Sequence, residues 1–209
     1  MVTTAPTRGR VLTGLSARYY DIGNALFGVP LVIRKHVSLI RLKDGDSLLD
    51  VGCGTGAVLR RVQRAFGERI SLLGIDPSPD ILRVAARKLR GCPNARVASG
   101  IGEGLSFPDN SFDWVVSCLT THHLPLDAKR LMIGECHRVL RPAGRLLVSD
   151  FAQPLNWIGG MVAFIWRRHA HTDENLSGQV YDLAKGQGFT DLSVVVQGGI
   201  IQHLMAAKA

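Results

Sequence analysis

A glycine-rich segment between an apolar run and a helical pattern most constrains how this chain can fold. The segment reads Asp50-Val51-Gly52-Cys53-Gly54-Thr55-Gly56, and the short apolar run Ser47–Val51 leads into it. An apolar run of this length that ends in glycines predicts a buried strand, and the glycines let the backbone approach a ligand closely. The helix that follows offers unpaired N–H groups at its start. The sequence therefore predicts a strand–loop–helix unit with a ligand at the loop.

Strand and helix patterns alternate along the following part of the chain. Apolar residues recur at helical spacing from Val58 to Phe66, where Gly67 closes the helix, and Ser78 is a suitable cap for the next helix. Further strands are predicted at Ile70–Ile75, Ala95–Ala98, Phe112–Cys118 and Arg145–Phe151. Repeated strand–helix units pair their strands in parallel through right-handed crossovers. We therefore expect an α/β fold with a doubly wound open sheet that has helices on both faces.

The pattern changes after Phe151. Asp127 is expected to cap the helix before this last strand, and Arg141–Gly144 is expected to separate that helix from the strand. A later helix is predicted near Gln179–Gln187. The runs Ser193–Val196 and Ile200–Met205 then predict a hairpin.

Length and composition favour one compact unit. The 209 residues are 46% hydrophobic, which suffices for a substantial core. We expect an N-terminal helical cap segment at 1–45 and one ligand-binding domain at 46–209. The four cysteines are scattered without a Cys-x-x-Cys pair and no signal-peptide pattern is seen, so a cytoplasmic location and no metal site are expected. The net charge of +8 is attributed to solvated helix faces.

A carboxylate downstream of the glycines indicates the kind of ligand. Asp76 ends the second predicted strand, where it can accept both hydroxyls of a ribose. Gly52, Gly54 and Ala57 also satisfy the dinucleotide pattern of NAD(P)-dependent oxidoreductases. Against that alternative, the acid Asp50 stands directly before the loop, and no second domain remains for a hydride acceptor. A carboxylate suits the ammonium and sulfonium of S-adenosylmethionine better than a pyrophosphate. A non-catalytic domain that binds this ligand is the other alternative.

The successive motifs resemble those of the class I S-adenosylmethionine-dependent methyltransferase superfamily. The similarity is closest to the group that includes the ubiquinone and menaquinone C-methyltransferases. It is carried by Asp50–Gly56, Asp76, Gly102–Asp113 and His137–Leu146, with Tyr20–Asn24 upstream. The resemblance implies a Rossmann-like, seven-stranded sheet of order 3-2-1-4-5-7-6 whose last strand is antiparallel. It also implies transfer of a methyl group to a small molecule. If the apolar segment 155–168 is a lid or a membrane contact, that acceptor is expected to be apolar, lipid-like or aromatic, such as a quinol or phenol.

The resemblance assigns the cofactor site. Asp50 and the glycines are expected around the methionine moiety, Asp76 on the ribose, and Gly102–Glu103 near the adenine. Ile101 stands where relatives carry an acid or amide for the adenine amino group. The residues predicted to contact S-adenosylmethionine are Tyr20, Asp50, Gly52, Cys53, Gly54, Gly56, Asp76, Pro77, Gly102, Glu103 and Cys118.

The loop after the fourth predicted strand carries the candidate catalytic groups. His122 and His123 stand beside the expected position of the transferable methyl, where one can act as a general base, although a structural role is an equal alternative. The Asn/Asp-Pro-Pro-aromatic motif of nucleic-acid amino-methyltransferases is missing at this place, so no nucleic-acid partner is expected. The segment 155–168 is apolar around most of a helix, which fits a buried helix, a lid or a peripheral membrane contact.

Overall fold

The computed structural model describes residues 28–151, 179–197 and 200–209 of the chain. Two predicted features, the cofactor residue Tyr20 and the apolar segment 155–168, lie outside the described residues. Within the described ranges, no helix combines the length and the apolar character that crossing a membrane requires.

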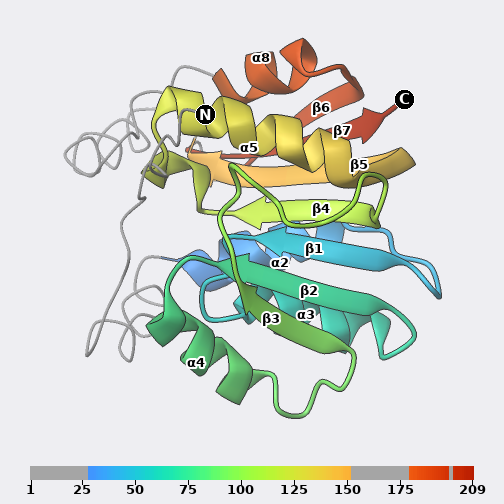
Figure 1. Ribbon diagram of the computed structural model, residues 1–209, viewed down its shortest axis with the longest axis vertical. Coiled ribbons are helices and arrows are strands. Elements are labelled where there is room, and N and C mark those ends of the chain that lie inside the picture. Colours follow the sequence, from blue (N-terminus) through green and yellow to red (C-terminus); the bar gives the residue numbers. More distant parts are fainter. Residues whose placement is uncertain (1–27, 152–178, 198–199) are drawn as a thin grey trace.

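Seven strands form one sheet in the order β3-β2-β1-β4-β5-β7-β6 (Figure 1). Neighbouring strands pair in parallel from β3 to β5, whereas β7 runs antiparallel to both β5 and β6. This arrangement confirms the predicted strand order and the antiparallel last strand. The strands are β1 (Ser47–Val51), β2 (Ser71–Asp76), β3 (Ala95–Ser99), β4 (Phe112–Cys118), β5 (Leu140–Phe151), β6 (Phe189–Gln197) and β7 (Ile201–Lys208).

Helices cover both faces of this sheet (Figure 1). They are α2 (Val29–Leu39), α3 (Ala57–Phe66), α4 (Pro79–Lys88), α5 (Leu126–Val139) and α8 (Gln179–Gly186), with a 3-10 turn η1 (Thr121–His123). The predicted caps hold for two of them: Gly67 is the C-cap of α3, and the Ser78 hydroxyl accepts from the N–H of Ile81 in α4. Helix α5 differs, because its N-cap is Pro125 and Asp127 lies inside the first turn. There the carboxylate can still interact with the positive end of the helix dipole.

Alternation along the strands divides the core into two layers. Leu49 and Val115 pack with the buried face of α5 and with α8, while Leu48 and Trp114 pack with α2, α3 and the end of α4. Successive strand side chains point to opposite faces, so a strand buried on both faces is apolar at nearly every position. The unbroken apolar runs in the sequence have this origin.

Strand β5 begins earlier than predicted, at Leu140 rather than Arg145. Its pairing with β4 is interrupted: Phe112 pairs with Leu140, and the next pair is Trp114 with Arg145. The residues between them bulge out, with Ala143 at a φ of 63°. Residues 141–144, which were predicted to separate α5 from the strand, therefore form a bulge near the start of β5.

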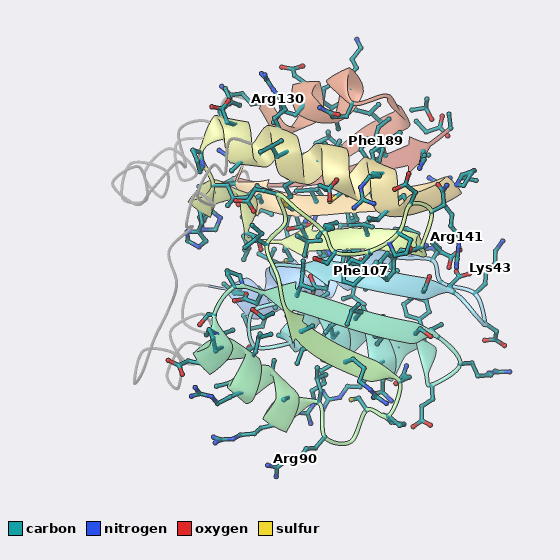
Figure 2. The ribbon with its side chains drawn as sticks, viewed as in Figure 1. Lys43, Arg90, Phe107, Arg130, Arg141 and Phe189 are labelled. Carbon is teal, nitrogen blue, oxygen red and sulfur yellow. The ribbon has the colours of Figure 1, made fainter. Side chains whose placement is uncertain are left out.

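A cluster of charged and polar side chains joins the amino ends of β1, β4 and β5. Arg141 pairs with the carboxylate of Asp113, which also accepts hydrogen bonds from the backbone N–H and the hydroxyl of Ser47, both at 2.8 Å. Figure 2 shows Arg141 and Lys43 at this end of the sheet. The glycine loop follows the opposite, carboxyl end of β1, where parallel sheets bind their ligands.

Candidate functional site

The glycine loop joins β1 to α3 and has the backbone form that glycine permits. Gly52, Gly54 and Gly56 have φ values of 75°, 51° and 74°, which L-residues with side chains rarely adopt. A Cβ atom on Gly52 would lie 2.3 Å from Cγ2 of Thr120. The Thr120 hydroxyl also donates to the carbonyl oxygen of Gly52 over 3.2 Å. The loop after β4 is thereby held directly against the glycine loop.

Asp50, the fourth residue of β1, is a buried carboxyl group. The residue is 1% exposed, and neither carboxyl oxygen has a hydrogen bond within the described part of the chain. Burial, together with the nearby charge of Asp76, raises its pKa from 3.8 to about 8. Such a group requires a cation to be stable as a carboxylate.

Asp76 ends β2 and faces the same loop. Its Oδ2 accepts from the N–H of Gly54 at 3.1 Å, and its Oδ1 accepts from the N–H of Ser78 at 2.9 Å. Burial raises the pKa of Asp76, and these two backbone donors oppose that rise. Each carboxylate oxygen can accept a second hydrogen bond, so the group can still bind two ligand hydroxyls.

The remaining predicted cofactor residues differ in how deeply they are buried. Gly102 packs so closely that a Cβ atom would lie 2.8 Å from Cγ of Met132, whereas Glu103 is half-buried and Pro77 is exposed. Cys53 is buried in the loop, and Cys118 is the last residue of β4. Burial raises the pKa of both thiols, so they remain neutral and unreactive near neutral pH.

These residues fit S-adenosylmethionine. The orphaned carboxyl of Asp50 would hold the ammonium group, since a buried acid without a partner gains most from a nearby cation. The oxygens of Asp76 would hold the ribose. The close packing at Gly52 and Gly102 leaves no room for a side chain at either position, so backbone atoms would face the cofactor there.

His122 forms a buried pair with Asp150. The His122 side chain is 8% exposed and that of Asp150 is 0% exposed, and Nδ1 of His122 lies 2.8 Å from Oδ1 of Asp150. The ring of His123 packs on that of His122 with centroids 3.9 Å apart. The structure therefore brings the two predicted catalytic residues together, and it joins the His122 ring to the Asp150 carboxylate.

An apolar cluster adjoins the pair. Phe151 meets the His122 ring edge-on, with centroids 5.0 Å apart. Phe151 belongs to a small cluster that joins the start of α2 to the ends of β4, β5 and β7; its members are Val32, Phe151 and Ile201, with Cys118, Leu119 and Ile200 packed against them. A polar, titratable group thus borders an apolar wall at the carboxyl end of the sheet.

Two residues of the site were not predicted from the sequence. Asp150 could have been identified from the sequence, because it is an acid near the end of the apolar run Leu146–Phe151, where an unpaired carboxylate would be costly. Thr120 could not have been identified, since its role depends on contact with Gly52, which is far away in the sequence.

Comparison with known proteins agrees with this geometry. Residues 48–144 match the family model described as a methyltransferase domain. The chain is similar to the demethylmenaquinone methyltransferase of Staphylococcus epidermidis, with 32% identity over 146 residues, 69% of this chain and 60% of that protein. It is also similar to the ubiquinone/menaquinone biosynthesis C-methyltransferase of Citrobacter koseri, with 30% identity over 66% of this chain and 57% of that protein. The chain thus spans less than two thirds of the length of these relatives.

A solved structure extends the likeness in fold. A SAM-dependent methyltransferase from Aquifex aeolicus superposes with a TM-score of 0.71 at 21% identity, covering 93% of this chain and 97% of that one. The strand order, the glycine loop with its two carboxylates and the matched family model all point the same way. The chain belongs to the class I S-adenosylmethionine-dependent methyltransferases.

Proposed function

We propose that this protein transfers the methyl group of S-adenosylmethionine to a small apolar acceptor of the quinol or phenol class. When bound, the cofactor supplies an electrophilic methyl on a sulfonium. The protein contributes alignment of the acceptor, exclusion of water and removal of a proton.

The main observation in favour of this acceptor class is the apolar cluster at the carboxyl end of the sheet. The cluster contacts the His122 ring through Phe151. Thr120, which precedes η1, contacts the glycine loop, so this wall and the predicted cofactor site are neighbours. An aromatic acceptor can bury its ring on such a wall and present its hydroxyl to the imidazole.

The relatives support the same class. Their names specify demethylmenaquinone, ubiquinone and menaquinone as the compounds concerned, which are quinones. Reduction to the quinol would make the ring a nucleophile for methyl transfer. Their identity to this chain of about one third leaves the particular acceptor to experiment.

The first test concerns the cofactor. Calorimetric titration should show binding of S-adenosylhomocysteine and no binding of NAD or NADP. Asp50→Asn should abolish this binding, whereas Asp113→Asn, the same change at the amino end of β4, should leave it intact. Heat evolved only for a dinucleotide would contradict the proposal, as would binding that is lost equally in both variants.

The second test concerns the acceptor. Purified protein with methyl-labelled S-adenosylmethionine should methylate short-tailed reduced demethylmenaquinone or simple naphthols. It should leave phosphoethanolamine and free amino acids unmodified, because the apolar wall offers no partner for their charges. Preference for the polar acceptors would contradict the proposed class.

A further inference from the structure

We propose that Asp150 is a positioning residue that fixes His122 as the base of the reaction, with Nε2 as the atom that takes the proton from the acceptor. The inference rests on the proposed function, because it concerns how the acceptor of that reaction is deprotonated. It also selects His122 over its neighbour His123.

Donors surround the Asp150 carboxylate. The Thr121 hydroxyl donates to Oδ2 at 2.6 Å, and the backbone N–H of His122 donates to the same oxygen at 3.1 Å. The backbone N–H of Phe151 donates to Oδ1 at 2.8 Å, and Nδ1 of His122 is at the same distance from Oδ1. Each oxygen thus has two partners, which fills the hydrogen-bonding capacity of an ionised carboxylate.

This arrangement keeps Asp150 ionised inside the protein. Burial alone would raise the pKa of the group, but the charge of His122 and the hydrogen bonds from His122, Thr121 and Phe151 hold the pKa below its ordinary value. An ionised carboxylate only accepts hydrogen bonds. Nδ1 of His122 must therefore carry a proton, and in the neutral ring Nε2 is left with the lone pair.

The second ring nitrogen of His122, Nε2, has no hydrogen-bond partner among the described residues. Within the described residues the ring of His122 makes its hydrogen bond through Nδ1, and its side chain keeps 8% of its surface exposed. His36 shows the contrast, since its Nε2 also has no partner there but is fully enclosed. In His203 both ring nitrogens are in contact with other side chains, namely Ser149 and Gln197.

Two other titratable groups lie near the pair in the described part of the chain. They are His123 on the same turn and Cys118 at the end of β4, whose thiol pKa is raised well above its usual value by burial, with contributions from Asp50 and Asp150. Asp150 is therefore the ionised group that stabilises a protonated His122, the state formed when Nε2 takes a proton.

The step balances without a further reagent. The acceptor oxygen or carbon forms a bond to the methyl as the methyl–sulfur bond breaks, and the sulfonium becomes a neutral thioether. The proton lost by the acceptor goes to Nε2 of His122 and then to solvent. Asp150 keeps its charge throughout.

The tautomer is measured first, by nitrogen NMR of protein carrying labelled histidine, assigned with His122→Gln. We expect wild-type His122 to carry its proton on Nδ1 at neutral pH. In Asp150→Asn the amide can donate to Nδ1, so the proton should move to Nε2. A wild-type His122 protonated on Nε2 would overturn the inference.

Rates are measured next, on the acceptor from the panel above that is methylated fastest. Asp150→Asn and His122→Ala should each lower kcat by about 10²–10⁴-fold, with the Kd of S-adenosylhomocysteine changed by less than about threefold. Adding Asp150→Asn to His122→Ala should cost little more, because Asp150 acts through His122. The wild-type rate should fall in acid, as expected when a neutral imidazole acts as the base, and this acid limb should vanish in His122→Ala.

Ser149→Ala is the matched control, since Ser149 is also buried on β5 and its hydroxyl contacts His36 and His203 at 2.6 Å. It should lower the melting temperature and leave kcat nearly unchanged. If Asp150→Asn melts below the assay temperature, Asp150→Glu replaces it, and its displaced carboxylate should lower kcat at least about tenfold.

The outcomes separate the two proposals. If no acceptor of the panel is methylated, the proposed function fails, and the NMR measurement still decides the tautomer. If methylation occurs and the Asp150 variants keep the wild-type rate across pH, the inference is overturned while the proposed function stands.

Discussion

Asp50→Asn should separate stability from cofactor binding, because Asp50 is a buried acid without a partner in the described protein. Folding raises its pKa from 3.8 to about 8, whereas the unfolded chain keeps the lower value. Between these two values the folded state holds one more proton than the unfolded state. The sign is therefore fixed: stability from this group is full below about pH 4 and is lost as pH rises to about 8.

The magnitude follows from the shift. At about 1.4 kcal/mol per pKa unit, the shift corresponds to roughly 6 kcal/mol, and relaxation of the buried site reduces this. Asparagine has a similar shape and no charge. We therefore expect Asp50→Asn to gain roughly 2–4 kcal/mol of unfolding free energy relative to wild type between about pH 5 and pH 8.

Urea unfolding of both proteins at several pH values measures this difference in the free energy of unfolding. S-adenosylhomocysteine should close it at about pH 8, because its ammonium pairs with ionised Asp50 in the wild type and not with the amide. Parallel stability curves for the two proteins over this pH range would show that Asp50 is not desolvated, and the proposed ammonium site would lose its basis.

Three further changes test other parts of the site. Asp76→Asn should weaken S-adenosylhomocysteine binding by about 1–3 kcal/mol in titration calorimetry, with native circular dichroism; unchanged affinity would place the ribose elsewhere. Gly52→Ala should destabilise the protein by about 1–3 kcal/mol in urea, because its Cβ would lie 2.3 Å from Thr120, whereas Gly54→Ala meets no atom within 4 Å and should cost less. The pKa of His36 is lowered to about 3 by burial and by the nearby His203, so stability should fall as pH drops below about 6.5. His36→Leu should flatten that slope in thermal melts, and an equal slope would contradict the buried neutral imidazole.

The strands near the site were predictable because burial on both faces leaves a direct mark on the sequence. Ser47–Val51 and Phe112–Cys118 have the same bounds in the structure as in the prediction. Each is a short apolar run followed by more polar or glycine-rich residues. A parallel strand in the middle of a sheet is apolar along its length because both of its faces are buried. The cofactor loop was predictable for a related reason, since its positive φ values demand glycine.

The start of β5 was not predictable in the same way. Arg141, Pro142 and Gly144 favour a break, and they do end α5. Whether such residues form a loop or a bulge depends on pairing with β4, where Leu140 finds Phe112 as its partner. That pairing is a long-range contact and leaves no local pattern.

The His122–Asp150 pair shows the same limit at the site. The sequence indicated a histidine base but could not choose between His122 and His123. The choice depends on which ring turns toward β5, and this is set by the 3-10 turn at Thr121–His123. The sequence likewise could not show that Asp50 has no hydrogen-bond partner among the described residues, because burial and pairing are properties of the folded protein.

The most direct measurement is methyl transfer from labelled S-adenosylmethionine to short-tailed reduced demethylmenaquinone, with the product identified by mass spectrometry. We expect a singly methylated quinol with the wild-type protein and with Asp113→Asn, and almost none with Asp50→Asn or His122→Ala. No methylated product from any quinol or phenol, from folded protein that binds S-adenosylhomocysteine, would contradict the proposed function. It would leave this chain as a binding domain of the same fold.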